Sequence, residues 1–176
     1  MVEIRISPFG GQGLFATKDF SEDDNIIEES PFISILDITA SDGNPHNHWT
    51  TSPLPVSGTS EAAQRIQKAM SELDEEIQNL FWSFSQAEIY GVERTVHGIF
   101  YTNYIDVTPA DGPDIGCMYR HICRLNHSCK PNAYWYYKQA EDKLALFACR
   151  DIKACEELFV DYCGHDECDE WYSSLI

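Results

Sequence analysis

The fold is decided by the segment Arg124-Leu125-Asn126-His127-Ser128-Cys129-Lys130-Pro131-Asn132. Its centre is polar, and the aromatic run Tyr134-Trp135-Tyr136-Tyr137 follows almost at once. Asn and His carry short, directional hydrogen-bonding groups. Pro131 fixes one backbone angle and biases Lys130 towards an extended conformation. The pattern predicts polar groups held in place beside a buried cleft. A satisfied polar turn that leads into a strand is the alternative.

Length and charge indicate one acidic domain. The chain has 176 residues, with 12 Lys and Arg against 29 Asp and Glu, for a formal charge of −17. This balance argues against nucleic acid or an anionic membrane as the direct ligand, because both need a basic surface. It favours a Lys/Arg-rich protein or peptide as partner, although solubility alone would also explain the charge.

Targeting signals and cysteine usage indicate the compartment. No stretch approaches the ~20 apolar residues that span a bilayer, and the first six residues show no signal-peptide pattern. The seven cysteines, an odd number, suit a reducing compartment better than a disulfide framework. We therefore expect an intracellular protein, in the nucleus, the cytoplasm or both.

Short strands are expected at both ends of the chain. Alternating and β-branched apolar residues predict strands at residues 2–6, 25–28, 31–36, 133–138, 143–150 and 157–162. Residues 133–138 and 143–150 should form a hairpin that turns at 139–142. The glycine-rich stretch 10–13 precedes another short apolar run, and on its own it is only a turn signal.

A helical insertion is expected between the two groups of strands. Apolar residues recur every three or four positions from Glu61 to Phe84, which predicts one long amphipathic helix with Ser60 as its N-cap. Core packing explains this stripe better than a coiled-coil partner does. The preceding residues, 41–60, have loop chemistry, and their His46 and His48 are expected to be exposed.

Three segments together resemble the SET domain of protein lysine methyltransferases. They are residues 11–16 (Gly-Gln-Gly-Leu-Phe-Ala), 124–132 as quoted above, and 157–162 (Glu-Leu-Phe-Val-Asp-Tyr). Their order and separation fit that family. Residues 98–103 resemble the segment after the helical insert of fungal-type SET proteins related to the SMYD group. The Cys-rich MYND module of those relatives is absent, because residues 35–100 contain no cysteine.

The resemblance implies a mainly β (α+β) fold of several small sheets. In it, segment 124–132 and the C-terminal strand 157–162 meet in a threaded, knot-like core. The SET domain would cover residues 1–162, with a helical insertion at about 60–90 inside a longer insert at about 41–97. Residues 163–176 would be a short post-SET-like tail. S-adenosylmethionine (SAM) binds on one face of such domains, and the substrate lysine enters from the other face through a narrow channel.

The resemblance also assigns roles to individual residues. Eight positions match cofactor-binding residues of the family: Gly11, Gln12, Gly13, Leu14, Asn103, Asn126, His127 and Tyr162. Three positions match channel-lining aromatics: Tyr134, Trp135 and Tyr136. Tyr162 also matches the catalytic tyrosine at the methyl-transfer centre. Its alternative is a strand-end tyrosine capped by a backbone carbonyl.

Two departures from the family pattern bear on these expectations. The family usually has glycine in the turn around residues 23–25, and here Asn25 is expected to take the left-handed conformation. The tail lacks the Cys-x-Cys-x4-Cys set of post-SET segments. Cys129, Cys163, His165 and Cys168 offer the ligands of a three-Cys, one-His zinc site. Buried or free thiols are the stronger alternative, because the spacing is off-pattern.

The predicted function is that of a SAM-dependent protein-lysine N-methyltransferase acting on a basic protein such as a histone. The alternative is a catalytically weak SET-fold binding or scaffold protein. A cysteine hydrolase that uses Cys129 and His127 is disfavoured, because a rigid strand-like segment suits a nucleophile and base poorly.

Overall fold

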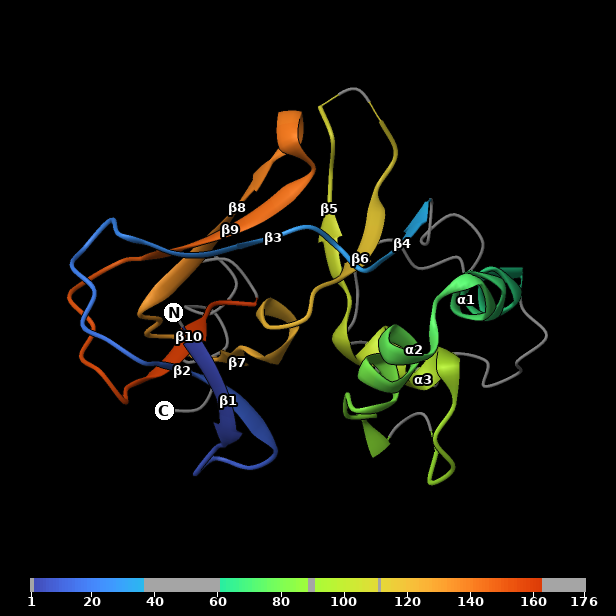
Figure 1. The fold of residues 1–176 in the computed structure, drawn as a ribbon, viewed down its shortest axis with the longest axis horizontal. Coiled ribbons are helices and arrows are strands. Elements are labelled where there is room, and N and C mark those ends of the chain that lie inside the picture. The colour runs from blue at the N-terminus through green and yellow to red at the C-terminus, as the bar shows by residue number, and fades with distance from the viewer. Residues whose placement is uncertain (1, 37–60, 89–90, 111, 163–176) are drawn as a thin grey trace, which may run out of the picture. The chain divides into compact units, whose positions relative to one another are not determined.

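The structure, a computed structural model, describes residues 2–36, 61–88, 91–110 and 112–162. Within these ranges the chain forms small β-sheets and three α-helices, so the expected mainly β fold with a helical insertion is confirmed (Figure 1). The chain divides into two compact units. The first comprises Met1–Ser30 with Arg124–Ile176, and the second comprises Pro31–Cys123.

The first unit contains a four-stranded sheet that joins both ends of the chain. Its spatial order is β1 (Val2–Ile6), β2 (Gln12–Ala16), β10 (Glu157–Val160) and β7 (Asn126–His127). Strands β1 and β2 form an antiparallel hairpin. Its turn is closed by the Ser7 amide, which donates to the Gly11 carbonyl at 3.0 Å. Gly10 and Gly11 have φ of 110° and 67°, a region that favours glycine.

A second sheet of the first unit carries the predicted hairpin. Its order is β3 (Asn25–Glu29), β9 (Lys143–Ala148) and β8 (Ala133–Lys138). The hairpin prediction is confirmed, and the chain reverses through the short 3₁₀ turn Gln139–Glu141. Asp142 then takes a left-handed conformation with φ of 49°. The buried face of this hairpin carries apolar residues of β9 such as Leu144 and Leu146.

The turn before β3 corrects one expectation. The left-handed residue is Asp23, with φ of 66°, and not Asn25. Asn25 already belongs to the strand, where it pairs with Phe147. The Asp24 carboxylate accepts from the Ser21 amide at 2.8 Å, and this local bond fixes the turn two residues earlier than expected.

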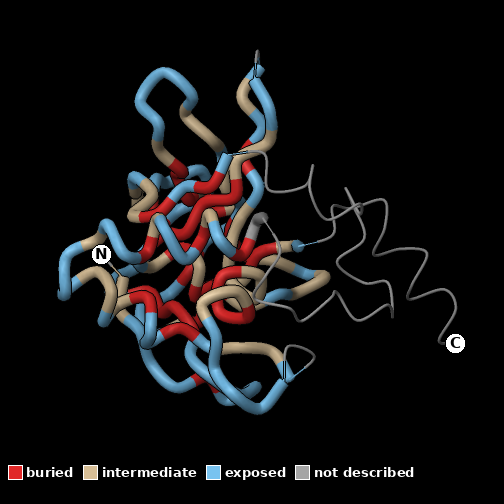
Figure 2. The backbone as a smooth tube through the Cα atoms, turned by 90° about the vertical axis from the view of Figure 1, so that its right-hand side faces the viewer, coloured by how far each residue is buried: buried red, intermediate tan, exposed pale blue. Residues whose placement is uncertain are grey.

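The second unit combines a three-stranded sheet with the helices. The sheet order is β4 (Ile33–Leu36), β6 (Ile115–Met118) and β5 (Ile105–Val107). The helices are α1 (Glu61–Glu72), α2 (Glu75–Trp82) and α3 (Val96–Asn103). Their shared core is Ile33, Ile35, Ile66, Met70, Phe81, Phe84, Ile99, Phe100 and Met118. Figure 2 shows buried residues along the elements and exposed residues in the turns.

The helical insertion differs from the predicted single helix. The helix is interrupted near Asp74. The Asp74 carboxylate accepts from the Ile77 amide at 2.9 Å and caps α2. An Asp that caps a new helix competes with continuation of the old one, and apolar periodicity does not reveal this. A third helix, α3, begins at Thr95 as N-cap, where the sequence had given no helix.

Some expectations fall outside the structure. Ser60, His46 and His48 lie beyond the described residues. Among the residues that are described, no helix is both long and apolar enough to cross a bilayer.

Candidate functional site

Strand β10 brings together segments that are far apart in the sequence. It pairs antiparallel with β2, with Leu158 opposite Leu14. It pairs in parallel with β7, with Phe159 opposite Asn126. The glycine turn before β2 and the polar segment 124–132 therefore flank one four-residue strand. The predicted meeting of segment 124–132 with the C-terminal strand is confirmed.

The side chain of Asn132 connects segment 124–132 to β10 by hydrogen bonds. This side chain is only 1% exposed. Its amide nitrogen donates to the Glu157 carbonyl at 2.8 Å, and its amide oxygen accepts from the Phe159 backbone N–H at 2.7 Å. The Asn132 side chain thus makes the two hydrogen bonds to β10 that the backbone of a neighbouring strand residue would make. Sequence reasoning gave Asn132 no separate role.

A second tie holds the end of the same segment. The Cys149 amide donates to the Asn132 carbonyl at 3.0 Å, and the Cys149 thiol donates to the Pro131 carbonyl at 3.3 Å. Burial raises the pKa of the Cys149 thiol, which keeps it protonated and able to donate. This cysteine therefore has a structural role.

Asn126 lies against a buried carboxylate. Its side-chain nitrogen donates to Oε1 of Glu157 at 2.8 Å and to the Gln12 carbonyl at 3.2 Å. The other carboxylate oxygen, Oε2, accepts from the Ser7 hydroxyl at 3.0 Å. Glu157 is 6% exposed. Sequence reasoning quoted Glu157 within its motif but overlooked it as a site residue. An acidic residue inside the otherwise apolar strand β10 was the available signal.

Tyr162 reaches back to the polar segment. Its hydroxyl donates to the Leu125 carbonyl, and its ring centre lies 5.4 Å from that of His127. The carbonyl contact is the structural alternative named for this tyrosine. A hydroxyl that donates its hydrogen keeps two lone pairs, so the contact is compatible with a catalytic oxygen as well.

The hydrogen bonds of His127 indicate its tautomer. Nδ1 accepts from the Tyr162 backbone N–H at 3.1 Å, and Nε2 lies 3.1 Å from Sγ of Cys129. When Nδ1 accepts, the hydrogen of a neutral imidazole is on Nε2 and points at the sulfur. A base for Cys129 would need the opposite arrangement. Although these side chains touch, the hydrolase reading remains disfavoured.

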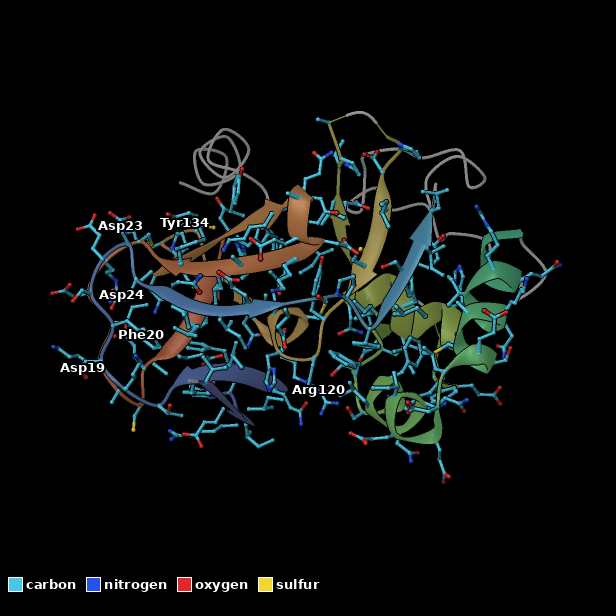
Figure 3. All side chains as sticks on the ribbon, turned by 45° about the horizontal axis from the view of Figure 1, so that its top comes forward. Asp19, Phe20, Asp23, Asp24, Arg120 and Tyr134 are labelled. Atoms are coloured by element: carbon cyan, nitrogen blue, oxygen red, sulfur yellow. The ribbon has the colours of Figure 1, made fainter. Side chains whose placement is uncertain are left out.

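The three candidate channel aromatics do not share one face of β8. The Trp135 ring stacks near the Tyr162 ring, with centroids 6.5 Å apart and planes at 22°. Tyr134 alternates to the other face and stacks on Phe147 at 5.6 Å. Figure 3 shows Tyr134 at the end of the sheet where the turn with Asp23 and Asp24 lies. Tyr136, on the Tyr134 face, is 62% exposed. Of the three, Trp135 is the one beside Tyr162.

The remaining predicted cofactor residues have defined surroundings. Leu14 is fully buried, so its side chain belongs to the core. The Gln12 side chain accepts from Arg124. Asn103 belongs to the second unit and donates to the carbonyls of Ser85 and Ile99, both at 2.7 Å. Its role stays a prediction.

The zinc prediction concerns residues that are mostly outside the structure. Cys163, His165 and Cys168 lie beyond the described residues, and Cys129 alone of the four is described. Among the described residues, no group of three or more His, Cys, Asp or Glu side chains is placed to hold a metal ion. The zinc site therefore stays a prediction.

A hollow of about 420 Å³ lies within the second unit. It is lined by Ala63, Gln64, Gln67, Lys68, Ser71, Thr95, Val96 and His97. None of these residues was predicted to bind SAM or substrate. The candidate site is therefore defined by the side chains around β10.

Comparisons with known proteins agree with the local geometry. The family described as SET domain matches residues 11–163. The histone-lysine N-methyltransferase set5 of Schizosaccharomyces pombe is 29% identical over 108 residues, which cover 61% of this chain and 32% of that protein. The chain thus spans about a third of the length of this curated relative.

A comparison of folds gives a candidate histone methyltransferase of Plasmodium falciparum. Its solved structure is similar to this chain with a TM-score of 0.45 and 14% sequence identity. The match covers 94% of this chain and 98% of that one.

Proposed function

This chain belongs to the SET domain family, and on that premise we propose that it transfers a methyl group from SAM to the side-chain amine of a protein lysine. The observation that carries the proposal is the pairing of β10 with β7, which brings Asn126 and His127 close to Tyr162. Those three residues match the family's cofactor-binding and catalytic positions. The SET domain would cover residues 1–162, with the insert at about 41–97 and a tail at 163–176.

The residues around β10 fit a ligand such as SAM. Gly11 has a left-handed backbone, and a side chain built there meets no atom within 4 Å, so the turn borders open space. Backbone groups of a glycine turn can approach a ligand closely. Asn126 and His127 add polar groups from the adjacent strand. We propose that these residues hold SAM, together with Gln12, Gly13, Leu14 and Tyr162, all from the first unit.

When bound, SAM supplies an electrophilic methyl group on a sulfonium. Tyr162 would place its hydroxyl oxygen beside the amine that accepts the methyl group. Leu125 fixes this hydroxyl by accepting its hydrogen, so the oxygen lone pairs are oriented before substrate arrives. Such prior orientation is worth most in an in-line displacement, where the reacting groups must be aligned.

The acceptor lysine must lose its proton before it can react. Bringing an amine with a pKa of about 10.4 to its neutral form at pH 7 costs about 4–5 kcal/mol. Aromatic walls disfavour the charged form, because burial removes water from the ammonium. Trp135 beside Tyr162 is the described side chain best placed to form such a wall. Tyr134 and Tyr136 are less suited, because they lie on the opposite face of β8.

The substrate is proposed to be a basic protein segment, such as a histone tail. The chain's formal charge of −17 favours encounter with Lys/Arg-rich partners. The name of the fission yeast relative supports a histone as the class of substrate. An intracellular location that includes the nucleus follows from this proposal.

Two measurements test the proposed function. Isothermal titration with SAM should show binding, and mass spectrometry of histones incubated with protein and SAM should show added methyl groups on lysine. Absence of SAM binding would overturn the proposal. Binding without methyl incorporation on any basic substrate would favour a SET-fold binding or scaffold protein instead.

A further inference from the structure

The buried carboxylate of Glu157 is hydrogen-bonded at both of its oxygens. It lies on β10 with Phe15 directly opposite on β2, so it shares a sheet face with Gly13 two residues earlier. Its two oxygens accept from different segments, Oε2 from Ser7 just after β1 at 3.0 Å and Oε1 from Asn126 on β7 at 2.8 Å. A carboxylate that is 6% exposed and engaged at both oxygens has a fixed orientation.

The position of Glu157 determines how Asn126 is turned. An ionised carboxylate only accepts hydrogen bonds, so the Asn126 nitrogen must face it. The second hydrogen of that nitrogen goes to the Gln12 carbonyl at 3.2 Å. The amide oxygen and nitrogen lie on opposite sides of Cγ, so the oxygen points away from Glu157. A ligand at Asn126 therefore meets a hydrogen-bond acceptor.

The same carboxylate explains why residue 13 is glycine. Gly13 has no left-handed backbone that would demand glycine. A Cβ added there would collide with Oε1 of Glu157 and lie 2.8 Å from its Cδ and 3.2 Å from the Asn126 nitrogen. Any side chain at position 13 would push the carboxylate away from Asn126.

We propose that Glu157 is a positioning residue that locks the Asn126 amide with its oxygen outward, and that Gly13 is glycine to leave space for this lock. The outward acceptor suits the α-ammonium group of an amino-acid ligand, as in the methionine part of SAM. This inference rests on the proposed function for the identity of the ligand. The lock itself depends only on the chain's own residues.

A double-mutant cycle tests the lock through SAM binding. Glu157→Ala should weaken SAM binding by about tenfold, because a charged hydrogen bond that orients Asn126 is lost. Gly13→Ala alone should weaken binding to a similar extent. In the Glu157→Ala background, Gly13→Ala should weaken SAM binding less than about twofold, because the carboxylate that its Cβ would displace is gone. Equal losses from Gly13→Ala in both backgrounds would overturn the proposal.

Two further variants separate positioning from a general structural effect. Glu157→Gln keeps one oxygen to accept from Asn126, while its nitrogen can donate to the Ser7 hydroxyl. SAM affinity should therefore stay within about threefold of the original protein. Glu156→Gln is the matched control, because the adjacent carboxylate contacts Asn132 instead of Asn126. It should leave SAM affinity unchanged, and a tenfold loss in either variant would contradict the proposal.

Nuclear magnetic resonance gives a readout that needs no ligand. The side-chain amide protons of Asn126 should exchange slowly with water in the original protein and in Glu156→Gln. They should exchange faster in Glu157→Ala and in Gly13→Ala. Unchanged exchange in both variants would overturn the lock. If the original protein binds no SAM, the proposed function fails, and this comparison still decides whether Glu157 orients Asn126.

Discussion

Asn126 and Asn132 stand at opposite ends of one short polar stretch and have opposite surroundings. Asn132 is 1% exposed, and its side chain bonds to backbone groups of β10. Asn126 is half-buried, and its side chain bonds to Glu157 and to a β2 carbonyl. The Asn132 side chain takes the place of a paired strand residue, whereas the Asn126 side chain is oriented by Glu157. Within one motif, the deeper half maintains the fold, and the shallower half is the part that we propose to contact a ligand.

This contrast is sharpest in the stability of the fold. Asn132→Ala should lower the free energy of unfolding by about 2–4 kcal/mol, because it leaves the Glu157 carbonyl and the Phe159 N–H buried without partners. Urea unfolding measures this change. Asn25→Ala is the matched control, since the Asn25 side chain contacts Glu28 at the surface. That control should change stability by less than about 0.5 kcal/mol. If Asn132→Ala were as stable as the control, the structural role assigned to Asn132 would be wrong.

Tyr162, which contacts Leu125 and His127 at the shallower end of this motif, should affect turnover instead of stability. Tyr162→Phe should leave folding intact and lower methyl transfer by about tenfold or more, because the oriented hydroxyl oxygen is lost. Steady-state methylation of a basic protein substrate measures it. Tyr137→Phe is a suitable control, since the Tyr137 hydroxyl bonds to Asp142 in the hairpin turn at 2.9 Å. Unchanged turnover in Tyr162→Phe would remove this hydroxyl from the mechanism.

The two faces of β8 extend the comparison to the aromatic residues. Trp135→Phe should lower kcat/KM for a protein substrate by about fivefold, because ring contact beside Tyr162 is reduced. Tyr136→Phe should leave kcat/KM within about twofold, since Tyr136 is exposed on the other face. Equal effects of the two changes would mean that the predicted channel does not use the Trp135 face.

The smallest effect concerns acid stability near Asn132. Partial burial acts to raise the pKa of Glu156, but hydrogen bonds from Arg150, the Lys153 amide and Asn132 together hold it below its usual value of 4.5. A lowered pKa adds stability above the unfolded value, and this is lost as pH falls through the folded value. Glu156→Gln should therefore be less stable than the original protein at pH 7, by about 1 kcal/mol or less, and nearly equal at pH 3. A difference in urea midpoint that does not change between these pH values would contradict this assignment.

Much of the site was predictable because three motifs lie in a fixed order. The hairpin 133–148 followed from alternation, and the meeting of segments 124–132 and 157–162 followed from the SET resemblance. Apolar periodicity could not reveal the break at Asp74, since a cap acts through one local hydrogen bond. The inward face of Trp135 depends on strand register, which the sequence left open. Glu157 was missed because its burial and orientation depend on contacts with residues distant in the chain, including Ser7, 150 positions earlier.

That bond between Ser7 and Glu157 has a consequence for synthesis on the ribosome. Unit Pro31–Cys123 is translated between the two halves of the other unit. It can therefore fold before β10, the partner strand of β2, has been synthesised. Closing a loop this long is slow compared with local contacts. The hairpin of β1 and β2 must therefore keep its second edge unpaired until β10 emerges. A nascent chain halted before residue 157 would expose that edge and would be the species that most needs a chaperone.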